Sequence, residues 1–248
     1  MKQITAHLNK IIRGDCLKEM PNIPDKSIDM ILCDLPYGTT ACKWDTIIPF
    51  EPLWKEYKRI TKDNGAIVLT ASQPFTSALV MSNPDNFKHS WIWDKGLSGN
   101  IMLADYQPMK IHEDVLVFSY GKLNYYPVKV QGRMREMRNN GMNKSAFGDF
   151  KNYQGEATDM RNPKTIIYFP NTNRKDITHP TEKPVELFAY LIKTYTNESD
   201  LVLDNCAGSG TTGVACKMLG RNYILIEKEA EYCKIAEDRV RNISNPLF

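Results

Sequence analysis

The segment Asp34-Leu35-Pro36-Tyr37 combines residue types that suit a planar ring carrying an amino group. The carboxylate of Asp34 can accept a hydrogen bond from such an amino group. Pro36 has no backbone N–H and restricts the chain, so neighbouring carbonyl groups can point into a site. The ring of Tyr37 offers an aromatic face for stacking. For this segment alone, an ordinary turn after a strand, with Asp34 as a cap, remains the alternative.

A second group of residues lies near the C-terminus, where Asp204 precedes a glycine-rich run. Gly208, Gly210 and Gly213 have the G-x-G-x-x-G spacing, which lets a backbone turn sharply and approach a ligand closely. Glu227 follows about where a dinucleotide fold places the carboxylate that binds ribose hydroxyls. No Lys follows the second glycine, which disfavours a loop for nucleoside triphosphates. The loop suits a nicotinamide dinucleotide and S-adenosylmethionine alike, and a plain strand-to-helix turn is the alternative.

Alternating strands and helices must position these two groups. Apolar runs predict buried strands over 28–33, 66–70, 201–203 and 222–226, and helical spacing is found over 51–61, 73–81, 185–195, 211–219 and 230–243. Two further strands, 89–93 and 115–119, are expected as an antiparallel pair at the sheet edge. The alternation predicts an α/β fold with a doubly wound, mostly parallel sheet. Ligands bind such sheets at the carboxyl ends of the strands, where both groups stand.

The segment 122–178 differs from the rest of the chain in charge and periodicity. It contains eleven Lys or Arg and five Asp or Glu, a net charge of +6, so the remainder of the +3 chain carries −3. Its apolar residues show little periodicity, which predicts a long irregular segment. The charge suggests a polyanionic partner, and a solvated loop is the alternative. The sequence therefore predicts one domain formed by 1–121 and 179–248, with an insert at 122–178.

Composition bounds the class of protein. A chain of 248 residues with 42% hydrophobic and 25% charged residues is typical of a soluble globular protein. No apolar run is long enough to cross a membrane, and residues 1–10 have no signal-peptide core, so cytoplasmic residence is expected. None of the six cysteines forms a C-x-x-C pair, which disfavours a zinc site and predicts reduced thiols, with Cys33 and Cys216 buried.

Taken together, these motifs resemble the amino-group DNA methyltransferases, in the permuted subgroup whose catalytic motif precedes the cofactor loop. Asp34 to Tyr37 resembles the catalytic Asp-Pro-Pro-Tyr, with Leu35 replacing the first proline. Asp204 to Thr212 resembles the loop Asp-x-Phe-x-Gly-Ser-Gly-Thr-Thr, with Cys206 replacing the Phe. The segment 14–17 resembles the family segment that contacts the cofactor's adenine, and 179–184 the segment that holds its methionine part. The likeness covers nearly the whole chain outside 122–178.

The resemblance implies methyl transfer from S-adenosylmethionine to the N6 amino group of adenine in double-stranded DNA, with the target base flipped out of the helix. It implies four catalytic residues, Asp34, Leu35, Pro36 and Tyr37. It implies ten cofactor-binding residues: Asp15, Cys16, Lys183, Asp204, Cys206, Gly208, Ser209, Gly210, Thr211 and Glu227. No metal is implied, because a sulfonium is already an activated methyl donor. The insert would recognise the target, with Arg133, Arg135 and Arg138 as candidate DNA contacts, and 93–95 would face the substrate.

Several alternatives stay open at this point. Methylation of cytosine N4 is the nearest, although Ser is common at position 34 in those enzymes, and RNA or protein-glutamine methylation is a further one. A nicotinamide-dependent oxidoreductase would use the glycine loop but leaves Asp34 to Tyr37 and the basic insert unexplained. A DNA-binding module without enzymatic activity is the third class. The recognition sequence, a restriction-linked, orphan or phage role, and the oligomeric state, including a homodimer, are also open.

Overall fold

The structure is a computed structural model, and it describes residues 4, 7–40, 42, 45–135, 144–145, 148–149, 158–171 and 182–243. The chain divides into two compact units. The larger consists of Met1–Tyr126 and Thr165–Phe248, and the smaller of Pro127–Lys164. Within the described part of the chain, no helix has the length and apolar character needed to span a membrane.

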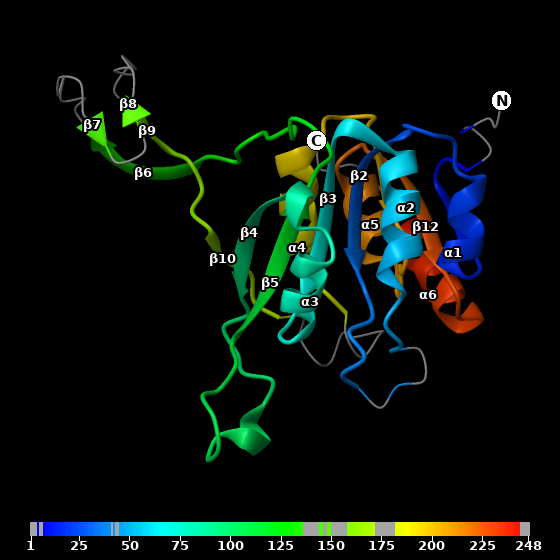
Figure 1. Cartoon of the computed structure of the whole chain (residues 1–248), viewed down its shortest axis with the longest axis horizontal. Coiled ribbons are helices and arrows are strands. Elements are labelled where there is room, and N and C mark those ends of the chain that lie inside the picture. The colour runs from blue at the N-terminus through cyan, green and yellow to red at the C-terminus, as the bar shows by residue number, and fades with distance from the viewer. Residues whose placement is uncertain are drawn as a thin grey trace. The chain divides into compact units, whose positions relative to one another are not determined.

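An eight-stranded sheet forms the centre of the larger unit (Figure 1). Its strands, in spatial order, are β1 Lys10–Arg13, β12 Asn222–Glu227, β11 Leu201–Asp204, β2 Ile28–Asp34, β3 Thr61–Ala71, β5 His112–Phe118, β4 Phe87–Asp94 and β10 Ile166–Tyr168. Among these strands β5 runs antiparallel to both neighbours, and the other neighbouring pairs are parallel. The predicted doubly wound, mostly parallel α/β sheet is confirmed.

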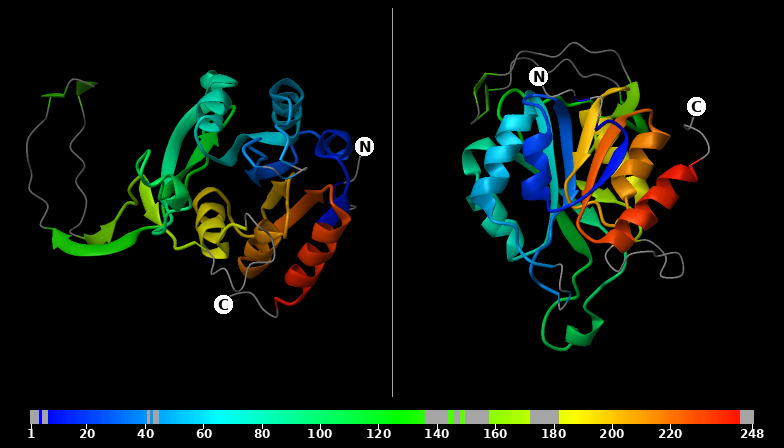
Figure 2. Two further views of the ribbon diagram at one scale, coloured as in Figure 1. Left: turned by 90° about the horizontal axis from the view of Figure 1, so that it is seen from below. Right: turned by 90° about the vertical axis from the view of Figure 1, so that its right-hand side faces the viewer.

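Helices cover both faces of this sheet, as Figure 2 shows. One face carries α1 Cys16–Glu19, α2 Phe50–Ile60 and α3 Phe75–Met81, and the other carries α4 Val185–Tyr195, α5 Thr211–Met218 and α6 Ala230–Arg241. The unit also contains the short 3-10 turns η2 Met20–Asn22, η3 Pro84–Asn86 and η4 Ile101–Leu103. The helix α2 shows why its residues fold this way. Its apolar residues recur at helical spacing and are buried on one side, and prolines stand at its start, where no backbone N–H is needed.

The central strand β2 explains why an uninterrupted apolar run predicts a buried strand. Alternate residues of a strand point to opposite faces of the sheet. Met30 and Leu32 pack in the core that includes α4 and α5, whereas Ile31 and Cys33 pack in the core that includes α2 and α3. All four side chains are fully buried. With a helix layer on each face, the middle positions 30–33 take apolar side chains, and the polar residues Asp29 and Asp34 stand near the two ends of the strand.

The expectation of an irregular segment over 122–178 is wrong in part. The strand β10 pairs in parallel with β4 and belongs to the main sheet, so the β4–β5 pair is antiparallel as predicted but does not form the edge. The smaller unit contains an antiparallel pair, β6 Val130–Arg135 with β9 Thr158–Arg161, and a two-residue ladder, β7 Lys144–Ser145 with β8 Gly148–Asp149. These strands, like β1, are short, so they carry too little alternation to be recognised by period.

Candidate active site

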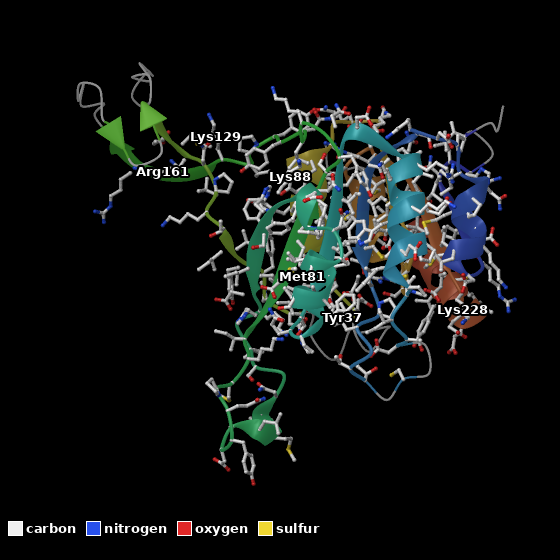
Figure 3. The ribbon with its side chains drawn as sticks, in the orientation of Figure 1. Tyr37, Met81, Lys88, Lys129, Arg161 and Lys228 are labelled. Carbon is white, nitrogen blue, oxygen red and sulfur yellow. The ribbon has the colours of Figure 1, made fainter. Side chains whose placement is uncertain are left out.

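A cavity of about 600 Å³ opens at the carboxyl ends of the central strands. Every residue of the predicted site except Gly210 lines it: Asp15, Cys16, Asp34, Leu35, Pro36, Tyr37, Lys183, Asp204, Cys206, Gly208, Ser209, Thr211 and Glu227. The segments meet because β2 and β11 are neighbours in the sheet, so the turn after each strand reaches the same edge. Figure 3 shows Tyr37 at this end of the sheet, beyond the last residue of β2.

The carboxylate of Asp34 is held by three side chains. The hydroxyl of Tyr37 donates a hydrogen bond of 2.7 Å to Asp34 Oδ1, and the hydroxyl of Thr70 donates to the same oxygen. The second oxygen, Oδ2, lies 2.9 Å from the ammonium nitrogen of Lys183. Thr70 is brought there by strand pairing, because it is the register partner of Asp34 in β3. Both carboxylate oxygens are therefore engaged, Oδ1 by two hydroxyls and Oδ2 by the ammonium.

The ring of Tyr37 has two neighbours. Its centroid lies 5.1 Å from that of Phe75, with an angle of 26° between the planes, so the two rings stack. The Lys183 ammonium lies 5.7 Å from the same centroid. Burial, followed by the charge of Asp34, raises the pKa of Tyr37 well above its ordinary value. The phenol therefore stays protonated at neutral pH and remains a hydrogen-bond donor to Asp34, a role that its sequence motif does not reveal.

Glu113, which no motif of the sequence indicates, lines the same cavity. Its Oε2 lies 3.2 Å from Lys183 Nζ, and its Oε1 lies 3.0 Å from Lys95 Nζ. Burial favours the neutral acid, but the charges of Lys183 and Lys95 outweigh it and lower the pKa of Glu113. Burial likewise opposes the charge of Lys183, yet the carboxylates of Asp34 and Glu113 raise its pKa. The cavity therefore contains a buried cluster of paired charges around Lys183.

The turn after β11 forms the other wall of the cavity. Glu227 Oε2 accepts a hydrogen bond of 2.8 Å from the backbone N–H of Gly208, and its Oε1 accepts one of 2.8 Å from that of Glu229. The carboxylate of Asp204 is buried and accepts hydrogen bonds from the hydroxyl of Thr212 and the backbone N–H of Cys206. The carboxylate of Asp204 therefore binds the loop at Cys206 and Thr212, whereas that of Glu227 binds it at Gly208 from the end of β12.

Gly210 does not line the cavity, and its own geometry explains the glycine. It precedes α5 with a φ of 80°, a conformation that costs other residues energy. A Cβ atom at this position would also lie 2.6 Å from the Cβ of Ala236 on α6. The prediction that Gly210 contacts the cofactor is therefore not supported by its position. This glycine allows the loop to turn and α6 to pack closely.

Arg239, which belongs to no motif of the sequence, anchors the loop to α6. Arg239 donates a hydrogen bond of 2.9 Å to the backbone carbonyl of Ser209 and forms an ion pair of 2.8 Å with Glu182. The hydroxyl of Ser209 in turn donates to Glu182 over 3.1 Å. Arg239 lies on an amphipathic helix, where an arginine is usually solvent-exposed, so only the tertiary packing reveals its role.

The start of α1 contributes two cavity residues, Asp15 just before the helix and Cys16 as its first residue. Asp15 accepts a hydrogen bond of 3.0 Å from the backbone N–H of Leu17 and so caps the first turn of the helix. A hydrogen bond to Cys206 and burial raise the pKa of Cys16, and burial raises the pKa of Cys33 to about 12. These thiols are therefore neutral, and Cys33 and Cys216 are buried as predicted.

The residues predicted to face the substrate and those predicted to contact DNA lie in different parts of the chain. Trp93 lines the cavity, buried, and donates a hydrogen bond of 2.8 Å to the carbonyl of Phe169, whereas Asp94 caps the turn at Gly96 and is not part of the lining. In the smaller unit, Arg133 is exposed. The backbone of Arg135 lies in β6, and Arg138 and the segment 179–181 lie outside the described residues.

Asp204 is expected to make stability depend on pH. Burial raises its pKa from the ordinary 3.8 to about 7, against the hydrogen bonds that favour the charged form. The folded protein thus binds this proton more tightly than the unfolded chain, so the carboxyl favours folding most below its unfolded pKa, and that contribution is lost as the pH rises through 7. The stability of the wild type relative to Asp204→Asn should therefore fall between about pH 4 and 7 and level off above. Denaturant midpoints measured across this range test it, and parallel curves for the two proteins would contradict it.

An α/β sheet that carries a glycine loop and an acidic strand end on one cavity, beside a second motif built for an amino group, is the arrangement of an S-adenosylmethionine-dependent methyltransferase. The family described as DNA methylase, of the N6/N4 type, matches residues 28–238, and the chain belongs to it. Its cofactor is S-adenosylmethionine. This assignment replaces the nicotinamide-dependent and non-enzymatic alternatives.

The relatives of this chain agree with the family. Type II methyltransferase M.HinfI of Haemophilus influenzae is 29% identical, over 99% of this chain and 72% of its own length. Type II methyltransferase M1.MboII of Moraxella bovis is 27% identical, over 91% of this chain and 94% of its own. The solved M1.HpyAVI–SAM complex is similar with a TM-score of 0.63 and 26% identity, covering 93% of this chain and 98% of that chain. The cytosine-N4-specific PvuII DNA methyltransferase, at 17% identity and a TM-score of 0.67, shares the fold, with 95% and 88% covered.

Proposed function

We propose that this DNA methyltransferase acts on the exocyclic N6 amino group of adenine in double-stranded DNA, at a specific sequence. The carboxylate of Asp34 is the observation that carries the proposal. It stands at the cavity, with one oxygen held by Tyr37 and Thr70 and the other paired with the ammonium of Lys183. In the family motif that Asp34 to Tyr37 resembles, an Asp at the first position is associated with adenine as the target base. Methylation of cytosine N4 is the alternative to be tested against it.

The residues of the glycine-loop wall suit the cofactor. The cavity volume lies within the range of small-molecule sites. We propose that Glu227 accepts hydrogen bonds from the ribose hydroxyls. Its two oxygens each accept one backbone N–H, which leaves a lone pair on each for a hydroxyl. Asp15 and Cys16 would border the adenine, and the loop residues Asp204, Cys206, Gly208, Ser209 and Thr211 would hold the remainder.

The chemistry follows from positioning and electrostatics. When bound, the cofactor supplies a methyl group on a positively charged sulfur, so a C–N bond forms as the S–C bond breaks. An exocyclic amine conjugated with a base is a weak nucleophile. Asp34 and a backbone carbonyl at Leu35 or Pro36 accept hydrogen bonds from this amine, which direct its lone pair toward the methyl carbon and favour the positive charge that develops on nitrogen. The ring of Tyr37 holds the base, which must be flipped out of the duplex to reach the cavity.

The methylated base found in the DNA identifies the atom to which the enzyme transfers the methyl group. Plasmid DNA from a host that expresses the protein would be digested to nucleosides and separated by mass, and the same DNA would be sequenced by a method that detects modified bases. We expect N6-methyladenine within one short recognition sequence. N4-methylcytosine in its place would establish the alternative. Unmodified DNA, together with no methyl incorporation by the purified protein, would contradict the proposed function.

The names of the relatives also indicate a biological role. They are called Type II methyltransferases, and we propose that this enzyme likewise protects a recognition sequence from a restriction endonuclease, in the cytoplasm where the DNA lies. DNA modified by the enzyme should resist an endonuclease that cuts the same sequence. Cleavage of fully modified DNA by every such endonuclease would contradict the protective role.

We propose that the basic segment 122–178 recognises the target DNA. A Lys or Arg side chain that neutralises a DNA phosphate releases a counterion from the DNA. Removing one such side chain should therefore reduce the slope of log DNA affinity against log salt concentration by about 0.9. The triple variant Arg133→Ala, Arg135→Ala and Arg138→Ala should therefore bind DNA more weakly and with a flatter salt dependence. The control replaces three exposed lysines on helices of the larger unit, Lys55, Lys193 and Lys234. Equal slopes for wild type and the arginine variant would show that these arginines do not bind phosphates.

A further inference from the structure

We infer that Lys183 competes with the amino group of the target base for Asp34, and that Glu113 holds the Lys183 ammonium aside while the base is bound. Lys183 and Glu113 would then be positioning residues of the reaction. The inference rests on the proposed function, and it replaces the prediction that Lys183 holds the methionine part of the cofactor.

The position of the ammonium is the first observation. Asp34 Oδ1 already accepts the hydroxyls of Tyr37 and Thr70, so Oδ2 is the oxygen open to an incoming amino group. Lys183 Nζ lies 2.9 Å from this Oδ2 and 5.7 Å from the centroid of the Tyr37 ring. The ammonium therefore lies beside both groups that the base requires, the acceptor oxygen of Asp34 and the aromatic ring of Tyr37. An incoming amino group must approach the same oxygen and the same ring, so it competes with the ammonium for the space beside them and for the charge of Asp34.

Glu113 provides a second place for the same charge. Its Oε2 lies 3.2 Å from Lys183 Nζ, so the ammonium stands between two carboxylates and a small movement exchanges one for the other. This oxygen is buried and, apart from that ion pair, has no hydrogen-bond partner in the described part of the chain. Lys95 engages the other oxygen over 3.0 Å and keeps Glu113 in place.

Burial makes the second carboxylate necessary. The Lys183 side chain is only 9% exposed, so its charge cannot be solvated by water when it leaves Asp34. An unpaired buried charge is strongly unfavourable, whereas a buried charge that keeps a partner is tolerated. Glu113 therefore lowers the free energy of the state in which Asp34 is released to the base. The antiparallel direction of β5 places Glu113 at this edge of the sheet, where the parallel strands end.

Glu113→Gln tests the inference because it keeps the shape of the side chain and removes the charge. Two duplexes would be compared, one with adenine and one with unsubstituted purine at the target position, so that their difference in affinity measures the contact of the amino group. Binding would be measured with a cofactor analogue that cannot transfer a methyl group. We expect Glu113→Gln to reduce the preference for adenine by about tenfold, the effect of one hydrogen bond to a charged group. The DNA concentration at half-maximal rate should rise with it, and affinity for S-adenosylmethionine should not change.

A double-mutant comparison separates this role from a purely structural one. In a Lys183→Met background there is no ammonium to hold aside, so adding Glu113→Gln should no longer reduce the adenine preference. The double variant also avoids leaving Glu113 charged without Lys183. Asp114→Asn is the matched control, because Asp114 is the neighbouring carboxylate on β5 and binds Thr76 rather than Lys183. Circular dichroism would establish that each variant is folded.

The outcomes are distinct. An unchanged adenine preference in Glu113→Gln, or an equal loss with and without Lys183, would overturn the inference. Weaker S-adenosylmethionine binding by Lys183→Met, with the adenine preference intact, would return Lys183 to the cofactor and also overturn it. In either case methylation by the wild type would leave the proposed function standing. A wild type that methylates no DNA would refute both.

Discussion

Asp34→Ala is expected to lower the rate of methyl transfer by about 10²-fold or more, the size of effect seen when one positioned hydrogen-bonding group is removed from an active site. The carboxylate is the group that engages the amine, and both of its oxygens are held in place by neighbouring side chains. It contributes nothing to the glycine-loop wall, where Glu227 and Asp204 hold the loop. Single-turnover rates at saturating DNA and calorimetric binding of S-adenosylmethionine would therefore respond differently, with the rate falling and the affinity largely retained.

Two further variants sharpen the Asp34 experiment. Asp34→Asn preserves the shape and one acceptor oxygen while removing the charge, so its effect on the rate measures the electrostatic share. Asp94→Ala is the control, because Asp94 also ends a parallel strand but accepts a hydrogen bond from Gly96 N and is not part of the cavity lining. Turnover by Asp34→Ala within a few-fold of the wild type would show that another residue engages the amine.

Glu227→Ala is expected to weaken S-adenosylmethionine binding by about tenfold to a hundredfold, because the variant cannot accept hydrogen bonds from the ribose. Glu227→Gln retains an acceptor for Gly208 N, so it separates the contact with the ribose from support of the loop. Both variants would be measured by calorimetry with the folded protein.

Glu229→Ala is the matched control for this measurement. Glu229 stands two residues further along, is exposed, and is not part of the cavity lining. Its removal should leave cofactor affinity unchanged. Equal affinities of the wild type and Glu227→Ala would refute the assignment of Glu227 to the ribose, and the glycine loop would then have to bind the cofactor without it.

Much of the fold could be predicted from the sequence because its signals are local. The run 30–33 is apolar throughout since β2 has helices on both faces, and that continuity is visible without knowing its neighbours. The helices α2 and α4 likewise show their buried faces through spacing. The strand β10 could not be recognised, because three residues carry no period and its place beside β4 depends on pairing between segments distant in the chain.

The same division holds for the site. Glycines, a proline and strand-ending carboxylates have local signatures, so the turns that carry the chemistry could be predicted, and all but Gly210 of the predicted residues line one cavity. The partner of each charge, by contrast, depends on tertiary packing. Thr70 and Glu113 reach Asp34 and Lys183 through the order and direction of β2, β3 and β5, and Arg239 reaches the glycine loop through the packing of α6. The order of strands is set by burial of both sheet faces over the whole chain, so the partner of a buried charge has no signature in the residues beside it.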